Sequence, residues 1–201
     1  MEKIKIYNES ISGKYLETVI DTLKDGGLII LPTDTLYAVA CDALNPKAIE
    51  KVCRLKGINP EKTNLSVLCN DISMVSDYAK FDNYAFKLMK ENTPGPFTFL
   101  FRAASSLPRA FKGRKVVGIR IPANEAALTI VSSLGNPLLS TSIQFEDEDY
   151  AINPELIAEN YEDKVDLMVE GEDGNIVPSA IVDCTGSQPE IIREGPQPLK
   201  E

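Results

Sequence analysis

The chain has 201 residues, of which 43% are hydrophobic, so it is long enough to form one domain with a sizeable core. Thirty acidic residues against 21 basic residues give a formal net charge of -9, which disfavours a broad nucleic-acid-binding surface. The absence of histidine from the sequence excludes Ser-His and Cys-His nucleophile pairs and histidine-ligated metal sites. An anionic ligand must therefore meet a local cluster of cations.

The sequence shows no targeting or membrane signal. Its N-terminus lacks an apolar signal core, and no run approaches the roughly 20 apolar residues that span a bilayer. We therefore expect a cytoplasmic protein without a membrane partner. The cysteines lie among apolar neighbours without CxxC spacing, which predicts reduced, buried thiols at Cys41, Cys53, Cys69 and Cys184.

Helices and strands alternate through the first half of the chain. Apolar residues at helical spacing predict a helix over residues 12–23, which the glycine pair at 26–27 ends. Asn45 is a helix-capping residue and Pro46 suits the first helical position, so a second helix is expected up to Gly57. The same reasoning predicts strands over residues 28–31 and 65–69 and helices over residues 72–79 and 83–92.

The second half of the chain is richer in strands. Phe97, Phe99 and Phe101 alternate with other residues, which predicts a strand whose phenylalanine face lies in the core. Further strands are expected over residues 116–121, 138–142, 165–169, 180–184 and 190–193, and helices over residues 125–134 and 154–161. The acidic stretch 145–150 is expected to be a loop. Because the last strands follow one another directly, we predict a single α/β domain over residues 1–201, with a twisted mixed parallel and antiparallel sheet.

The common signatures of phosphate-binding loops and nucleophile elbows are absent, since the sequence contains neither GxxxxGK[ST] nor GxGxxG nor GxSxG. Instead, hydroxyl-bearing or cationic residues recur at the ends of predicted strands. Ligands bind at strand ends of open α/β sheets, and such side chains suit carboxylates and phosphates. The sequence therefore predicts an anion-binding site that includes Thr33, Thr35, Thr98, Arg120, Ser140, Thr141, Ser142, Ser179 and Arg193.

Each of these residues also has a structural explanation. Thr33 and Thr35 suit hydrogen bonds within a turn as well as contacts with a ligand. The hydroxyls of residues 140–142 are equally typical of a solvated strand end. Arg120 favours a functional role more strongly, because an arginine that is half-buried on a strand needs a partner anion.

Two charged segments carry weaker signals. Lys56 and Lys62 bracket a turn after the second helix, where they face either a phosphate group or water. The acidic residues 146–149 form either a solvated loop or an oxygen-ligated Mg²⁺ site. From these segments we predict no metal ligand. We also assign no residue a catalytic role.

Several short blocks follow one another in an order known from one protein family. They are Leu31-Pro-Thr-Asp-Thr-Leu-Tyr37, Leu55-Lys-Gly57 with Lys62 and Asn64 beyond, Pro94-Gly-Pro-Phe-Thr98, Gly118-Ile-Arg-Ile-Pro122, Leu139-Ser-Thr-Ser142, Pro178-Ser-Ala-Ile-Val-Asp183 and Ile192-Arg-Glu-Gly195. The match runs from about residue 27 to residue 195, which is nearly the whole chain. In these blocks the chain resembles the YrdC family, which includes the L-threonylcarbamoyladenylate synthases.

The resemblance implies both a fold and a reaction. Members of the family fold a twisted α/β sheet around a large concave, positively charged cavity. The synthases among them join threonine, bicarbonate and ATP into threonylcarbamoyl-AMP and pyrophosphate, which feeds the modification of a tRNA adenosine. The resemblance therefore implies ATP as a substrate, and the reaction is compatible with Mg²⁺ as a helper ion.

The resemblance also assigns residues to the two ends of the substrate. At the threonine end it implies Thr35, Arg120 and Ser140, to which we add Thr33, because Pro32 turns the chain so that both threonine hydroxyls are presented. At the nucleotide end it implies Lys56, Asn64, Ser142, Ser179 and Arg193, to which we add Lys62 and Thr98.

The chain departs from the synthase pattern at three places. Synthases carry a Lys-x-Arg pair where this chain reads Lys56-Gly57-Ile58, so an apolar residue replaces an expected guanidinium. Their Ser-x-Asn block reads Ser142-Ile-Gln144, and Tyr37-Ala-Val-Ala40 replaces a glycine-bearing sequence. In these departures the chain resembles the YciO branch of the family. They predict weakened synthase activity.

Two other functions remain open at the level of the sequence. One is a module that binds double-stranded RNA or tRNA in the same basic cavity. Its affinity would fall steeply with salt, because phosphate contacts release counterions. The other is a sensor that binds ATP or AMP without turnover. Product formation separates the synthase from both.

Overall fold

The computed structural model of the protein describes residues 1–60, 62–112, 115–143 and 151–200. Its centre is one mixed sheet, and the strands are β1 Glu2–Lys5, β2 Ile29–Leu31, β3 Ala38–Asp42, β4 Leu65–Leu68, β5 Ala79–Lys80, β6 Phe97–Ala103, β7 Val116–Arg120, β8 Leu138–Ser142, β9 Leu167–Glu170, β10 Ala180–Asp183 and β11 Glu190–Arg193. Their order across the sheet is β1-β9-β2-β3-β8-β4-β7-β6-β10-β11, with β5 beside β6. Parallel and antiparallel pairs both occur, which confirms the predicted fold class.

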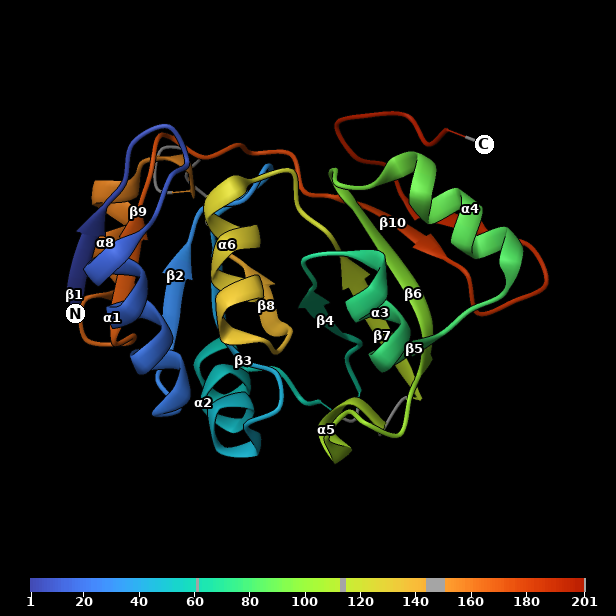
Figure 1. The fold of residues 1–201 in the computed structure, drawn as a ribbon, viewed down its shortest axis with the longest axis horizontal. Helices are drawn as coiled ribbons and strands as arrows, with labels where there is room; N and C mark the ends of the chain where they lie inside the picture. The colour runs from blue at the N-terminus through green and yellow to red at the C-terminus, as the bar shows by residue number, and fades with distance from the viewer. Residues whose placement is uncertain (61, 113–114, 144–150, 201) are drawn as a thin grey trace.

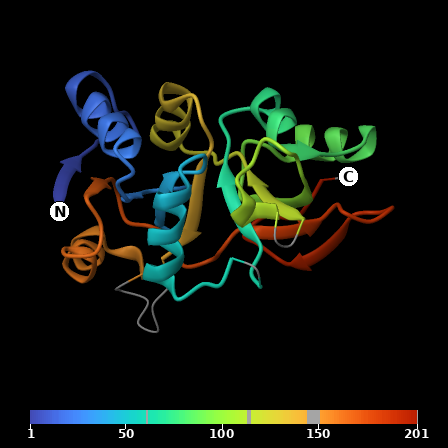
Figure 2. The same cartoon turned by 90° about the horizontal axis from the view of Figure 1, so that it is seen from below.

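Helices cover both sides of the sheet. They are α1 Gly13–Lys24, α2 Pro46–Lys56, α3 Ile72–Tyr78, α4 Asn83–Asn92, α5 Arg109–Lys112, α6 Glu125–Leu134 and α8 Pro154–Tyr161. Figures 1 and 2 show α1, α6, α3 and α4 along one side, and α8 and α2 on the other. In the described part of the chain, no helix is long and apolar enough to cross a membrane.

The ends of the helices follow the predicted capping chemistry. The Asn45 side chain accepts hydrogen bonds from the backbone N–H groups of Lys47 and Ala48, at 3.1 and 3.2 Å, and Pro46 starts α2. Gly57 ends α2 with a φ of 62°, in the left-handed region that glycine adopts without steric cost. The predicted boundaries of α2 are therefore confirmed.

Three strands, β1, β3 and the two-residue β5, were not predicted from the sequence, and one was placed too early. All five residues of β3 are buried, so the strand shows no alternation, and it contains two alanines, which favour strands weakly. In β1 only Ile4 is buried, between charged residues. The strand expected over residues 165–169 begins at Leu167, because the N–H of Val165 still bonds to the Tyr161 carbonyl at the end of α8.

The four cysteines are free thiols. Cys41, Cys53 and Cys69 are buried as predicted, and burial raises the pKa of Cys69 to about 12. Cys184 is only partly buried, which corrects the prediction, because it lies just beyond the end of β10. The thiols behave as core packing groups with little thiolate at neutral pH.

Tyr37 ties the segment after β9 to the turn after β2. Its buried hydroxyl donates to the carbonyl of Glu172 at 2.7 Å and accepts from the N–H of Gly171 at 3.1 Å. The N–H of Asn175 bonds to the carbonyl of Thr35 at 3.0 Å. This segment leads directly to Ser179, so the turn and the start of β10 are held in one arrangement.

Candidate functional site

Polar and charged residues from distant parts of the sequence line one cavity of about 370 Å³, which we call the polar cavity. Strands β3, β4, β6, β7, β8, β10 and β11 contribute to it, together with the end of α2 and the turn that follows. Its lining residues are Ala38, Val52, Cys53, Lys56, Ile58, Thr63, Asn64, Leu65, Ser66, Thr98, Arg120, Leu139, Ser140, Thr141, Ser142, Ser179, Ile181 and Arg193. The structure thus brings together most of the residues that the sequence assigned to a ligand.

Three predicted residues lie elsewhere. The Thr33 hydroxyl donates to the carbonyl of Leu36 at 2.7 Å and accepts from the N–H of Thr35 at 3.1 Å. Thr35 is 1% exposed, with its hydroxyl 3.2 Å from that of Thr33. Both hydroxyls therefore serve the turn, and neither residue lines the polar cavity. Lys62 lies in the turn after α2, where its N–H bonds to the Asn59 carbonyl, and it does not line the cavity either.

Ser66 is a lining residue that the sequence analysis did not single out. Ser140, Ser66 and Gly118 are register partners on the neighbouring strands β8, β4 and β7, so they share one face of the sheet. A Cβ atom at Gly118 would collide with the Ser66 hydroxyl and lie 3.1 Å from the Ser66 Cβ. Gly118 therefore leaves the room that Ser66 occupies. A polar residue between two apolar ones in β4 was the only sequence signal.

Arg120 lies at the end of β7 with only 8% of its side chain exposed. The partner anion that its burial requires is Asp34, whose Oδ1 lies 2.5 Å from Arg120 Nη2. The same Nη2 lies 3.4 Å from the Thr33 hydroxyl, to which it donates. Burial lowers the pKa of Arg120, although the charge and hydrogen bond of Asp34 raise it. Asp34 lies between the two threonines for which the sequence suggested a turn, and no short-range pattern indicated its pairing with Arg120.

The other cations of the cavity bind backbone carbonyls. Lys56 Nζ donates to the carbonyl of Ser142 at 3.2 Å, and burial lowers the pKa of Lys56. Arg193 donates from Nε and Nη2 to the carbonyl of Ser179, at 3.0 and 2.7 Å. The Ser179 hydroxyl also lies 2.9 Å from that of Thr98. These contacts fix both cations at the cavity wall and leave donors for a ligand.

An irregular strand pair places Arg193. Val182 of β10 pairs with Ile191 of β11, whereas the preceding residue, Ile181, pairs with Arg193. One extra residue, Ile192, therefore stands in β11 as a bulge. Because of this bulge, Arg193 lies opposite Ile181, which itself lines the polar cavity. The charge of Arg193 also lowers the pKa of Arg120, as expected for two cations that face one cavity.

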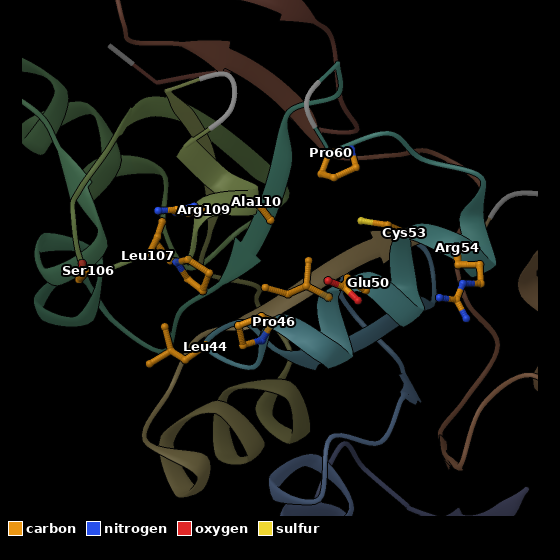
Figure 3. A pocket seen from close by; sticks show the side chains of 12 residues that line it. Leu44, Pro46, Glu50, Cys53, Arg54, Pro60, Ser106, Leu107, Arg109 and Ala110 are labelled. Atoms are coloured by element: carbon orange, nitrogen blue, oxygen red, sulfur yellow. The ribbon is translucent and has the colours of Figure 1, made fainter.

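A second cavity of about 730 Å³ lies between α2 and residues 106–110 (Figure 3). Its lining is largely apolar, with Leu44, Pro46, Leu107 and other carbon-rich side chains, and it shares Cys53 with the polar cavity. Although this cavity is larger, Ser106 supplies its single lining hydroxyl among the described residues, and the charges of Arg54 and Arg109 are accompanied by that of Glu50. We therefore take the polar cavity as the candidate site.

Among the described residues, no group of three or more aspartate, glutamate, cysteine or histidine side chains is arranged to hold a metal ion. The acidic residues 146–149, considered above for Mg²⁺, lie outside the described residues, as does Gln144. We therefore assign no Mg²⁺ ligand and derive no step through the ion.

Comparison with known proteins identifies the family. A family model that covers the Sua5, YciO and YrdC proteins, described as "Telomere recombination", matches residues 21–195. The chain belongs to the Sua5/YciO/YrdC family. The uncharacterized protein YciO of Escherichia coli K12 is 34% identical over 193 residues, which cover 94% of this chain and 93% of YciO. Its crystal structure matches with a TM-score of 0.91 and 32% identity, over 100% of this chain and 98% of that one. These matches place the chain in the YciO branch, as its sequence motifs indicated.

Synthases of the family are also similar to the chain. A putative threonylcarbamoyl-AMP synthase of Methanocaldococcus jannaschii is 30% identical over 201 residues, which cover 98% of this chain and 95% of that protein. The crystal structure of Pyrococcus abyssi Sua5 complexed with L-threonine matches with a TM-score of 0.87 at 23% identity, over 99% of this chain and 59% of that one. At this identity the second match shows a shared fold. Both YciO and synthase members therefore share this fold.

Proposed function

We propose that the polar cavity binds ATP and a threonine-like amino acid and joins them with bicarbonate into threonylcarbamoyl-AMP and pyrophosphate. The observation that carries this proposal is the convergence of Lys56, Arg120 and Arg193 on one hydroxyl-lined cavity. A family relative that is a putative threonylcarbamoyl-AMP synthase and a Sua5 structure with bound threonine support the same assignment. Carboxylates and phosphates are the ligands that such cations suit.

The proposed reaction needs no covalent intermediate with the protein. The amino group of threonine and bicarbonate form a carbamate and release water, and a carbamate oxygen then attacks the α-phosphorus of ATP. Pyrophosphate leaves with the electrons of the broken P–O bond. Positioning the reactants lowers the barrier by about 7 to 11 kcal/mol in well-oriented systems, and fixed cations stabilise the developing charge. The lack of histidine is therefore compatible with catalysis.

In this scheme Arg120 and Ser140 hold the amino-acid end of the substrate. Lys56, Arg193 and the hydroxyls of Thr98, Ser142 and Ser179 hold the nucleotide, with Asn64 at the cavity wall. Ile58 lines the cavity and packs against the core, at the position where synthases carry a guanidinium. One charge-assisted hydrogen bond is worth about 1.5 to 3 kcal/mol, so its loss lowers the rate by about 10- to 150-fold.

The test is incubation with ATP, threonine and isotope-labelled bicarbonate, followed by mass spectrometry of the products. We expect labelled threonylcarbamoyl-AMP at a low rate, and at least about tenfold more of it in Ile58→Arg, because the added guanidinium contacts phosphate. Ile58→Leu keeps an apolar side chain of similar volume and should match the wild type. A folded Ile58→Arg variant without any gain would show that Ile58 does not limit the rate. Nucleotide binding without product in every variant would instead indicate a sensor.

A further inference from the structure

The cations of the polar cavity differ in whether a carboxylate neutralises them. Arg120 forms an ion pair with Asp34, so this pair is neutral overall. Within the described residues, no carboxylate lies within ion-pair distance of Lys56 or Arg193, and their partners are the carbonyls of Ser142 and Ser179. Among the described residues, Lys56 and Arg193 therefore carry two positive charges that no carboxylate compensates.

The ion pair leaves part of both side chains unused. Only Nη2 of Arg120 reaches Asp34, and among the described residues Arg120 Nε and Asp34 Oδ2 are buried without a hydrogen-bond partner. A guanidinium has five N–H donors, so Arg120 can donate to a second oxygen ligand from the cavity side. Such a ligand would still experience the negative charge of Asp34. A singly charged carboxylate experiences half the repulsion that a doubly charged phosphate does.

We propose that Asp34 is a specificity-determining residue whose buried charge makes the Arg120 subsite of the cavity bind the carboxylate of an amino acid and reject phosphate dianions. This inference rests on the proposed function and deepens it. Without Asp34, Arg120 would be a third strong phosphate site, and the phosphates of ATP could occupy the place of the amino acid. Discrimination of this kind works through repulsion of the wrong ligand as well as attraction of the right one.

The test uses calorimetric titration of the full chain with threonine and, separately, with inorganic phosphate. Asp34→Asn removes the charge but keeps an oxygen that can accept from Arg120. We expect the affinity for phosphate to rise by at least about tenfold relative to that for threonine. Asp34→Glu keeps the charge and should keep the wild-type ratio. Thr33→Val removes the hydrogen bond from Arg120 to the Thr33 hydroxyl without a change in charge. This variant should also keep the wild-type ratio of the two affinities.

An unchanged ratio of the two affinities in folded Asp34→Asn would overturn the inference, because Asp34 would then only position Arg120. If Asp34→Asn does not fold, Asp34→Ser removes the same charge. An unchanged ratio of the two affinities in Asp34→Ser would likewise overturn the inference. A wild-type protein that binds no threonine would contradict the proposed function. The inference would then be judged by phosphate alone, and a phosphate affinity that does not rise in Asp34→Asn would overturn it.

Discussion

Replacement of Arg120 by methionine is expected to destabilise the folded protein by about 3 to 5 kcal/mol, because Asp34 would remain as a buried carboxylate without its partner. The side chains of the pair are only 8% and 12% exposed, so water cannot easily replace the lost guanidinium. The free energy of unfolding, measured by urea denaturation, checks this expectation. Arg102→Met, at an exposed arginine of β6, is the matched control and should change stability little.

The double variant Asp34→Asn with Arg120→Met separates stability from function. No uncompensated buried charge remains in it, so most of the lost stability should return. Binding of threonine should stay lost, because the cation that holds the carboxylate is gone. A double variant no more stable than Arg120→Met alone would show that the ion pair does not account for the destabilisation.

Gly195→Ala is expected to disturb the start of β10 and with it the nucleotide end of the cavity. A Cβ atom at residue 195 would collide with the backbone nitrogen of Ala180 and lie 2.9 Å from its Cα, so backbone must move. Ala180 follows Ser179, which Arg193 holds through two hydrogen bonds. We expect a loss of about 1 to 3 kcal/mol in stability and of about tenfold or more in ATP affinity.

Gly186→Ala provides the control for this substitution. A Cβ atom there would lie 3.7 Å from the carbonyl oxygen of Gln188, an ordinary van der Waals distance. Unfolding in urea and calorimetric titration with ATP should both leave this variant close to the wild type. Equal behaviour of Gly195→Ala and Gly186→Ala would mean that the contact with Ala180 does not shape the site.

Local chemistry made much of the fold predictable. Asn45 and Gly57 fix the ends of α2 through contacts within a few residues, and such signals are readable in the sequence. Strand β3 was missed because complete burial removes the alternation on which strand prediction depends. Its five residues pair with β2, which precedes it by a short turn, and with β8, which lies far away in the chain.

The candidate site was predictable only in outline. Strand-end hydroxyls and cations could be expected to converge, and Arg120, Ser140 and Arg193 do line one cavity. The sequence could not decide whether Thr33 and Thr35 face a ligand or their own turn, because both arrangements use the same short-range geometry. Nor could it show that Asp34 pairs with Arg120 or that Gly118 makes room for Ser66, because both contacts depend on the long-range arrangement of the chain.

Calorimetric titration of ATP into the wild type and into Lys56→Met and Arg193→Met tests the central claim most directly. Lys47→Met, at an exposed lysine of α2, is the control for loss of positive charge. If the two cations grip the phosphates of ATP in one cavity, the wild type should bind at a single saturable site. Each cavity variant should then lose about tenfold or more in affinity, whereas Lys47→Met should not. A wild type that does not bind ATP, or cavity variants that bind it as tightly as the control, would contradict this account.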